Sequence, residues 1–326
     1  MCTRGPKEGN YEFFDKIEDY IEKVKNAESN PQLSNAQSKF ALSNAESKCN
    51  AFMESSKSHF MDKRTAKPIC EQFVKLYYSL TDNNKCIKGV DPDYNKCSKF
   101  LNYWINFKLR KSIKNEDSTF CDVYGHLDGQ LTNNDIYNID LYFINDIDKD
   151  DLYKMNILYN LYENYNILNA IDYTNSEQDK RQLLTHSTAC CPDYIKASYI
   201  CNDDDEDKNP KFCEELETFK SKYHVLYQSV IKKGSDYSDY FMTLSNCPNS
   251  KIITTAVTGS IIGLIPLFGV LYKFTPLGQM FRSKKGKLNN YISNNDEDMI
   301  NMSLMEHENE QIKFQKRTFN IKYQSV

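Results

Sequence analysis

The stretch FCEELETFKSKYHVLYQSV, residues 212–230, gives the clearest structural signal in this chain. Its apolar side chains recur every three or four residues, while glutamate and lysine occupy the opposite face. This spacing is typical of an amphipathic helix that packs one face on a core. The apolar stripe consists of Phe212, Leu216, Phe219, Tyr223, Leu226, Tyr227 and Val230. The stretch therefore predicts a long, core-facing helix.

Four earlier segments repeat this helical spacing. They run from Phe13 to Val24, from Phe73 to Leu80, from Leu101 to Leu109 and from Met155 to Tyr165. The alternation of apolar and polar residues that marks strands is nearly absent between the turn signals. The chain has 326 residues, of which 40% are hydrophobic, so it can bury a sizeable core. We therefore expect an all-α fold.

A short polar sequence is duplicated between the first two of these segments. Leu33–Lys39 reads LSNAQSK, and Leu42–Lys48 reads LSNAESK. A solenoid needs longer and more numerous repeats than these. We interpret residues 26–50 as a polar duplicated insert, either an expandable loop or a surface helix.

Residues 252–272, IITTAVTGSIIGLIPLFGVLY, contain no charge over a length of 21 residues. At about 1.5 Å per residue, this length just crosses a hydrocarbon core of about 30 Å. The alternative is an unusually long buried helix, but Pro266 and three glycines suit such a helix poorly. We therefore predict one transmembrane helix over residues 251–274.

The flanks of this segment predict its orientation. It is preceded by Asp236 and Asp239, with only Lys251 close by, and it is followed by the basic cluster Arg282, Lys284, Lys285 and Lys287. Because positive residues favour the cytosolic side, we expect an exoplasmic domain over residues 1–250 and a cytosolic tail over residues 275–326. The basic cluster either binds an anionic membrane surface, at about 1 kcal/mol per residue, or simply stops transfer.

The predicted span has two further features. Gly259 and Gly263 have a GxxxG spacing that could let two spans approach closely, although chance placement explains it equally well. The N-terminal residues contain no apolar run long enough for a signal peptide, so we expect the span itself to target the chain to a membrane.

All eleven cysteines precede residue 250. Cysteines confined to one side of a predicted span indicate that this side matures in an oxidising compartment, where disulfides persist. The alternative is reduced, buried cysteine. Because adjacent cysteines seldom bridge each other, neighbours in the sequence are expected to have different partners. The candidate disulfide cysteines, whose pairing stays open, are Cys49, Cys70, Cys86, Cys97, Cys121, Cys190, Cys191, Cys201, Cys213 and Cys247.

An acidic run resembles the start of a calcium-binding loop. Its members Asp146, Asp148 and Asp150 have the spacing of the first three EF-hand ligands. However, Asp151 stands where the turn glycine belongs, and Ile157 stands where the closing glutamate belongs. We therefore expect no calcium site, and we expect the run to place negative charge at the start of a helix.

Composition and the remaining motifs argue against several functions. The formal net charge is −4, and the 41 basic residues are scattered, so no basic stripe for nucleic acid is present. The histidines are dispersed, no cysteine spacing suits zinc, and no P-loop, dinucleotide fingerprint or serine nucleophile elbow occurs. We therefore expect no enzyme activity, cofactor, metal or nucleic-acid partner. An enzyme whose catalytic residues converge from distant positions is the alternative.

Several blocks, four before the predicted C-terminal span and one directly after it, together resemble one family. They are ICEQFVKLYYSL from Ile69, CSKFLNYWINFKLR from Cys97, ILYNLYENYNIL from Ile157, FCEELETFKSKY from Phe212 and FTPLGQMFRSKKGK from Phe274. The chain resembles the Plasmodium interspersed repeat superfamily and is most similar to its Vir variant antigens of Plasmodium vivax. The resemblance implies a helical, disulfide-linked ectodomain, export to the infected red cell and a role in antigenic variation, immune evasion or adhesion. It implies no catalysis.

Two functions remain in view. In the first, the chain is a variant surface antigen whose ectodomain meets antibodies or a host-cell receptor. In the second, it is an intracellular membrane scaffold or trafficking protein of the infected red cell, which acts through a cytosolic partner of its tail. Both functions need a lipid bilayer as a partner. Oxidised cysteines favour the first function, and reduced cysteines favour the second.

Overall fold

The computed structural model describes most of the chain before residue 249. The described residues are 11–29, 36–82, 85–132, 139, 141–202 and 210–248, without the side chains of 36–44 and 116–118. All of them belong to the first of two units, which divide after Ser250. In this described part, no helix is both long enough and apolar enough to cross a membrane. The predicted span, with Gly259 and Gly263, and the basic tail cluster lie outside the described residues.

The described secondary structure is helical throughout, apart from one isolated bridge between Phe60 and Ile113. The all-α prediction is therefore confirmed for these residues. The longer helices are α1 (Ile17–Glu28), α2 (Ala36–Ser56), α3 (Ala66–Thr81), α4 (Tyr94–Arg110), α5 (Glu116–Leu131), α6 (Lys149–Asn169), α7 (Ser176–Asn202) and α8 (Pro210–Ile231). The short ones are η1 (Glu12–Lys16), η2 (Lys63–Thr65), α9 (Ser235–Ser238) and η5 (Leu244–Asn246).

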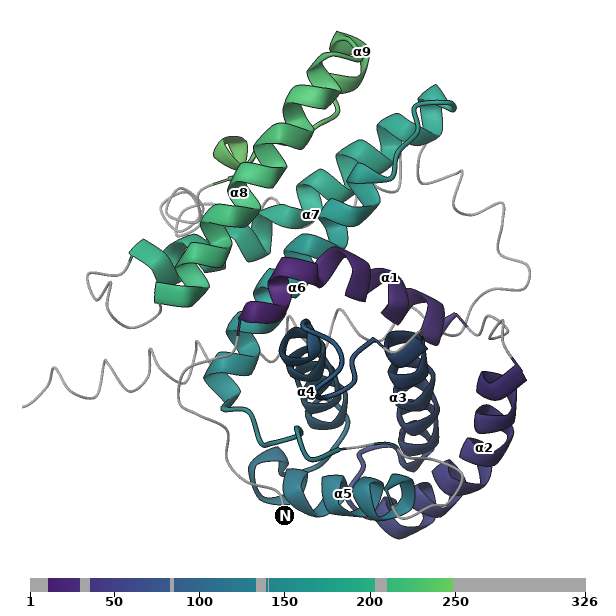
Figure 1. Cartoon of the computed structure of the whole chain (residues 1–326). Helices are drawn as coiled ribbons and strands as arrows, with labels where there is room; N and C mark the ends of the chain where they lie inside the picture. The colour runs from purple at the N-terminus through teal and green to yellow at the C-terminus, as the bar shows by residue number, and fades with distance from the viewer. Residues whose placement is uncertain are drawn as a thin grey trace, which may run out of the picture. The chain divides into compact units, whose positions relative to one another are not determined.

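Two groups of helices meet at α1 and α6 (Figure 1). In one group, α2 packs on α3 and α5, while α4 packs on α3 and α5. In the other, α6 packs on α7 and α8. Helix α1 contacts both α3 and α6, and η1 packs on α4. The N-terminal segment therefore lies between the two groups and helps to join them.

Helix α8 has the stripe that its sequence predicts. Of the seven apolar residues in that stripe, six are buried, and Tyr227 is partly buried against the core. Phe219 lies among aromatic rings, with its centroid 5.3 Å from that of Tyr162 and 5.6 Å from that of Tyr223. Such pairs contribute roughly 0.5–1.5 kcal/mol each beyond area burial. Aromatic packing therefore fixes α8 on α6.

The second copy of the duplicated sequence lies in α2. Ala45 within it is 1% exposed, and Cys49 and Phe52 on the same helix are fully buried. Helical spacing places these residues on one face, which packs on α3 and α5. Within this copy, Ala45 therefore packs on the core while Glu46 and Ser47 are exposed, as on a helix with one face toward solvent.

The acidic run before α6 has structural roles. Asp148 is the N-cap of α6, and its carboxylate accepts a hydrogen bond of 2.9 Å from the amide of Asp150. Asp146 pairs with the buried guanidinium of Arg110. Among the described residues, no group of three or more histidines, cysteines or acids could hold a metal ion.

Disulfides join elements within both groups. The bridges between described residues are Cys49–Cys70, Cys86–Cys97, Cys191–Cys247 and Cys201–Cys213, and Cys121 is disulfide-bonded as well. Cys190 is a correction to the sequence prediction, because it is a buried free thiol. Successive residues of a helix point in different directions, so Cys191 reaches Cys247 while Cys190 faces the core beside Tyr223. Burial raises the pKa of the Cys190 thiol to about 12.

Candidate functional site

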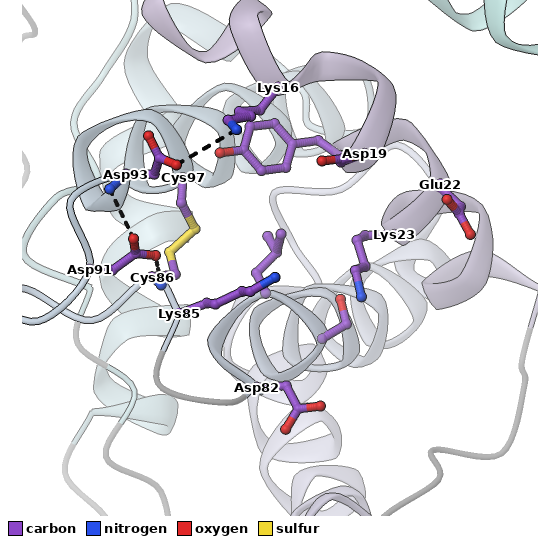
Figure 2. Close-up of a pocket in the computed structure, with 13 residues that line it drawn as sticks. Lys16, Asp19, Glu22, Lys23, Asp82, Lys85, Cys86, Asp91, Asp93 and Cys97 are labelled. Carbon is purple, nitrogen blue, oxygen red and sulfur yellow. Dashed lines mark hydrogen bonds and ion pairs between the residues drawn. A yellow bond between two sulfur atoms is a disulfide. The ribbon is translucent and has the colours of Figure 1, made fainter.

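A hollow of about 430 Å³ lies between α1, the end of α3 and the loop that leads into α4 (Figure 2). Its wall on the loop side contains the Cys86–Cys97 disulfide. Tyr20 from α1 and Leu80 from α3 also line it, and both are largely buried. Ligand pockets usually measure about 300–1,000 Å³, so this hollow can hold a side chain or a small molecule.

The loop beside the hollow is held by several short-range bonds. The disulfide joins Cys86 to Cys97, with 5.7 Å between their Cα atoms. The Asp91 carboxylate accepts hydrogen bonds from the backbone amides of Cys86 and Asp93. The carbonyl of Ile87 accepts hydrogen bonds from the amides of Val90, at 3.1 Å, and Asp91, at 3.0 Å. These bonds fix the loop, and the disulfide ties it to the first turn of α4.

Residue chemistry explains why this sequence forms the loop. Gly89 has a φ of +79°, a conformation that side-chain-bearing residues rarely adopt. Aspartate readily bonds backbone amides in turns, and Pro92 cannot continue a preceding helix. The hydrogen bonds from Cys86 and then from Asp93 hold the pKa of the Asp91 carboxyl below its ordinary value. Asp91 therefore remains an anion at the edge of the hollow.

The lining of the hollow carries more acidic than basic side chains. Its carboxylates are Asp19, Glu22, Asp82, Asp91 and Asp93, and its ammonium groups are Lys16, Lys23 and Lys85. Lys16 pairs with Asp93 at 3.8 Å. Across the described part of the chain, Asp19, Glu22, Lys23 and Lys85 have no ion-pair partner. The lining therefore has a net charge of −2, from five acids and three lysines.

The pKa of the Tyr20 hydroxyl is raised by its surroundings in the hollow. It is 6% exposed, and its ring stacks on Phe100 with 4.5 Å between centroids. Burial raises the pKa of its hydroxyl, and the charges of Asp93, Asp91 and Asp19 raise it further. Within the described ranges, this hydroxyl has no hydrogen-bond partner. The charges that raise this pKa beyond the effect of burial are therefore all carboxylates.

Two aliphatic side chains project from the loop next to the hollow. Val90 is 62% exposed and Ile87 is 38% exposed. We call the segment Ile87–Val90 the loop tip. Single exposed apolar residues are common on protein surfaces, but here two lie three residues apart on a loop that is held by a disulfide and hydrogen bonds. The loop tip and the hollow together form a surface with apolar and charged parts.

The chemistry of this surface suits binding better than catalysis. No histidine lines the hollow, and the hydroxyl of Ser79, which does, donates to the carbonyl of Leu76. A hydroxyl nucleophile needs an adjacent general base, and Ser79 has a backbone carbonyl instead. The surface therefore offers charged and apolar side chains for contact with a partner, and it offers no activated nucleophile.

The sequence predicted only part of this surface. It placed Cys86 and Cys97 among the candidate disulfide cysteines, but it did not identify the hollow. None of the other candidate cysteines lines the hollow. A signal was present in residues 85–97, KCIKGVDPDYNKC, where two cysteines enclose a glycine and an Asp-Pro turn.

Comparison with known proteins gives one family. The family model described as Plasmodium vivax Vir protein matches residues 225–326, which agrees with the resemblance found in the sequence. Of this range, the structure describes residues 225–248. No curated protein and no solved structure matches the chain.

Proposed function

The match at residues 225–326 supports membership of the chain in the Plasmodium Vir family, and on this premise we propose that the protein is a non-enzymatic variant surface antigen of infected red cells. Its helical domain would face outward and present a surface to antibodies or to a host-cell receptor. Residues 252–272 would anchor it in the membrane, with the basic cluster on the cytosolic side.

The observation that carries this proposal is the set of disulfides in the helical domain. Four bridges lie between described residues, and all eleven cysteines of the chain precede residue 250. Disulfides persist in extracellular and secretory compartments and are reduced in a cytosol. A domain that depends on them is suited to the outside of a cell.

The way the fold is held also supports an antigen. The loop tip is fixed by a disulfide and backbone hydrogen bonds, so its side chains carry little of the folding energy. Surface substitutions away from the core usually change stability by less than about 0.5 kcal/mol. Such residues can vary between related chains without loss of the fold, which is what antigenic variation needs.

Protease treatment of intact infected cells tests the proposal. Separate antibodies would detect the helical domain before Lys251 and the tail after Lys273. We expect loss of the helical domain and protection of the tail. Permeabilised cells are the control, since both regions should then be digested.

Protection of both regions in intact cells would contradict surface display and favour the intracellular scaffold. In that case, thiol labelling without prior reduction should modify the cysteines that pair in the structure. Protected thiols would again favour maturation in an oxidising compartment.

A further inference from the structure

Two histidines that are far apart in the sequence lie side by side in the fold. The ring centroids of His59 and His126 are 6.2 Å apart, and the ring planes are tilted by 40°. Both side chains are half-buried, and in the part of the chain that the structure describes neither ring has a hydrogen-bond or ion-pair partner. A neutral imidazole has one nitrogen with a free lone pair, which can bind a metal ion. The pair therefore brings two unused metal-binding nitrogens into one place.

The backbone is held in place at both histidines. His59 follows α2, and its carbonyl accepts a hydrogen bond of 2.7 Å from the amide of Lys114. His126 lies within α5, where the nearby Val123 and Leu127 are buried. Helix α5 packs on α2 (Figure 1). Because the fold already brings the two side chains together, little conformational entropy is lost when one ion binds both of them.

The spacing of the two rings suits one ion between them. A histidine nitrogen binds Zn²⁺ at about 2.0–2.1 Å and lies about 1 Å from the centre of its ring, so two rings on one ion have centroids about 5–6.5 Å apart. The separation of 6.2 Å between His59 and His126 lies in this range. Gly129, one turn further along α5, has no atom within 4 Å of the position that a Cβ would occupy. The surface next to His126 is therefore open to an ion and its water.

The type of ligand decides the class of ion. Imidazole suits Zn²⁺, Cu²⁺ and Ni²⁺, whereas Mg²⁺ and Ca²⁺ prefer oxygen ligands. Among the residues that the structure describes, no group of three or more histidines, cysteines or acids could hold an ion, so water completes the coordination of an ion at this pair. Imidazoles bind a metal as neutral ligands, and the selection therefore does not depend on the net charge around them.

We propose that His59 and His126 together bind one divalent transition-metal ion, with water in the remaining coordination positions. The ion links α5 to the segment that follows α2, and both belong to the same group of helices. Structural zinc sites have four protein ligands, so an ion with two protein ligands is held reversibly. The inference goes beyond the proposed function and does not depend on it.

Titration of the full chain with Zn²⁺ tests the inference. Zn²⁺ is the probe because it has no redox chemistry and cannot oxidise the Cys190 thiol. Mg²⁺ is the control ion. We expect Zn²⁺ to bind and to raise the midpoint of thermal unfolding, because the ion binds the folded chain and not the separated histidines of the unfolded one. Mg²⁺ should leave the midpoint unchanged.

Variants show whether the two histidines act together. His59→Ala and His126→Ala should each weaken Zn²⁺ binding by at least about tenfold, since each leaves a single imidazole. The double variant should bind no more than about twofold more weakly than either single variant, because the joint site is already lost. The matched control is His224→Ala, which removes an exposed histidine of α8 that contacts Gln228. It should keep the affinity of the parent chain.

Chemical modification of the parent chain gives a second measurement that needs no substitution. Diethyl pyrocarbonate modifies free imidazole nitrogens, and mass spectrometry of peptides locates each modified histidine. Bound Zn²⁺ should protect His59 and His126 from the reagent and leave His224 reactive.

Three outcomes would overturn the inference. They are absence of Zn²⁺ binding, binding that both single variants retain, and equal protection of His59, His126 and His224 from the reagent. None of them bears on whether infected cells display the domain.

Discussion

The loop tip and helix α8 hold apolar residues in opposite environments. On α8, Phe219 is buried among the rings of Tyr162 and Tyr223, and burial keeps the helix in place. On the loop, Val90 points into water, and a disulfide and backbone hydrogen bonds keep the loop in place. The comparison shows two ways to fix a structure. Burial restricts which side chains are allowed, whereas a covalent staple leaves the exposed side chains free to vary.

The strongest test of this contrast is removal of the two apolar side chains. Phe219→Ala leaves a cavity among aromatic rings and should lower the free energy of unfolding by about 3–5 kcal/mol. Val90→Ala removes an exposed side chain and should change it by less than about 0.5 kcal/mol. Urea unfolding with the disulfides intact measures both. Similar losses for the two variants would show that the loop tip also depends on burial.

Removal of one disulfide from each group of helices compares how much a long and a short closed loop contribute to the free energy of unfolding. The Cys191–Cys247 bridge closes 56 residues and Cys86–Cys97 closes 11. Loop-closure entropy predicts losses of about 4 and about 3 kcal/mol respectively when both cysteines of a bridge become serine. All variants carry Cys190→Ala, so that no free thiol can exchange.

Hydrogen exchange then shows where the effect of each removal lies. Loss of Cys86–Cys97 should speed amide exchange mainly between Ile87 and Asp93, because the loop has no core of its own. Loss of Cys191–Cys247 should affect α7 and the segment after α9. Acceleration between Ile87 and Asp93 that is no greater than that of the core amides would contradict a locally held loop.

The sequence predicted the elements that are held by burial better than those that are held by disulfides. The stripe in residues 212–230 has a helical period, and six of its seven residues are buried as expected. Cysteine pairing has no such period, so the sequence could not tell that Cys191 is bridged while its neighbour Cys190 is a thiol. The hollow was also missed, because it forms where α1, the end of α3 and a loop meet, and no local pattern records that meeting.

Carboxyl groups in the two regions should respond to pH in opposite directions. On α8, burial and the nearby charges of Asp15 and Glu214 raise the pKa of Glu215 from 4.5 to about 7. Its contribution to stability is fully present below pH 4.5 and is lost as the pH rises to about 7. On the loop, hydrogen bonds to backbone amides lower the pKa of Asp91. Its contribution is present above its unfolded pKa and is lost as the pH falls.

Urea unfolding of neutral variants at several pH values tests this pair. Glu215→Gln should stabilise the chain at pH 8 relative to the parent and have little effect at pH 4. Asp91→Asn should destabilise it at pH 8 and have less effect at pH 3. Because each variant is compared with the parent at the same pH, the titration of other groups largely cancels. A pH-independent effect of Glu215→Gln would show that burial does not shift this carboxyl.

The smallest expected effect comes from two glycines that differ only in backbone conformation. Neither Gly89 on the loop nor Gly125 within α5 has any atom within 4 Å of the position that a Cβ would occupy, so an added methyl group meets no neighbour. Gly89 has a φ of +79°, where an L-residue is strained, and Gly89→Ala should destabilise the chain by about 1 kcal/mol. Gly125 lies inside a helix, where alanine is favoured, and Gly125→Ala should stabilise it by about 1 kcal/mol. If both substitutions shifted the midpoint of thermal unfolding in the same direction, the loop could leave its left-handed turn at no cost in free energy.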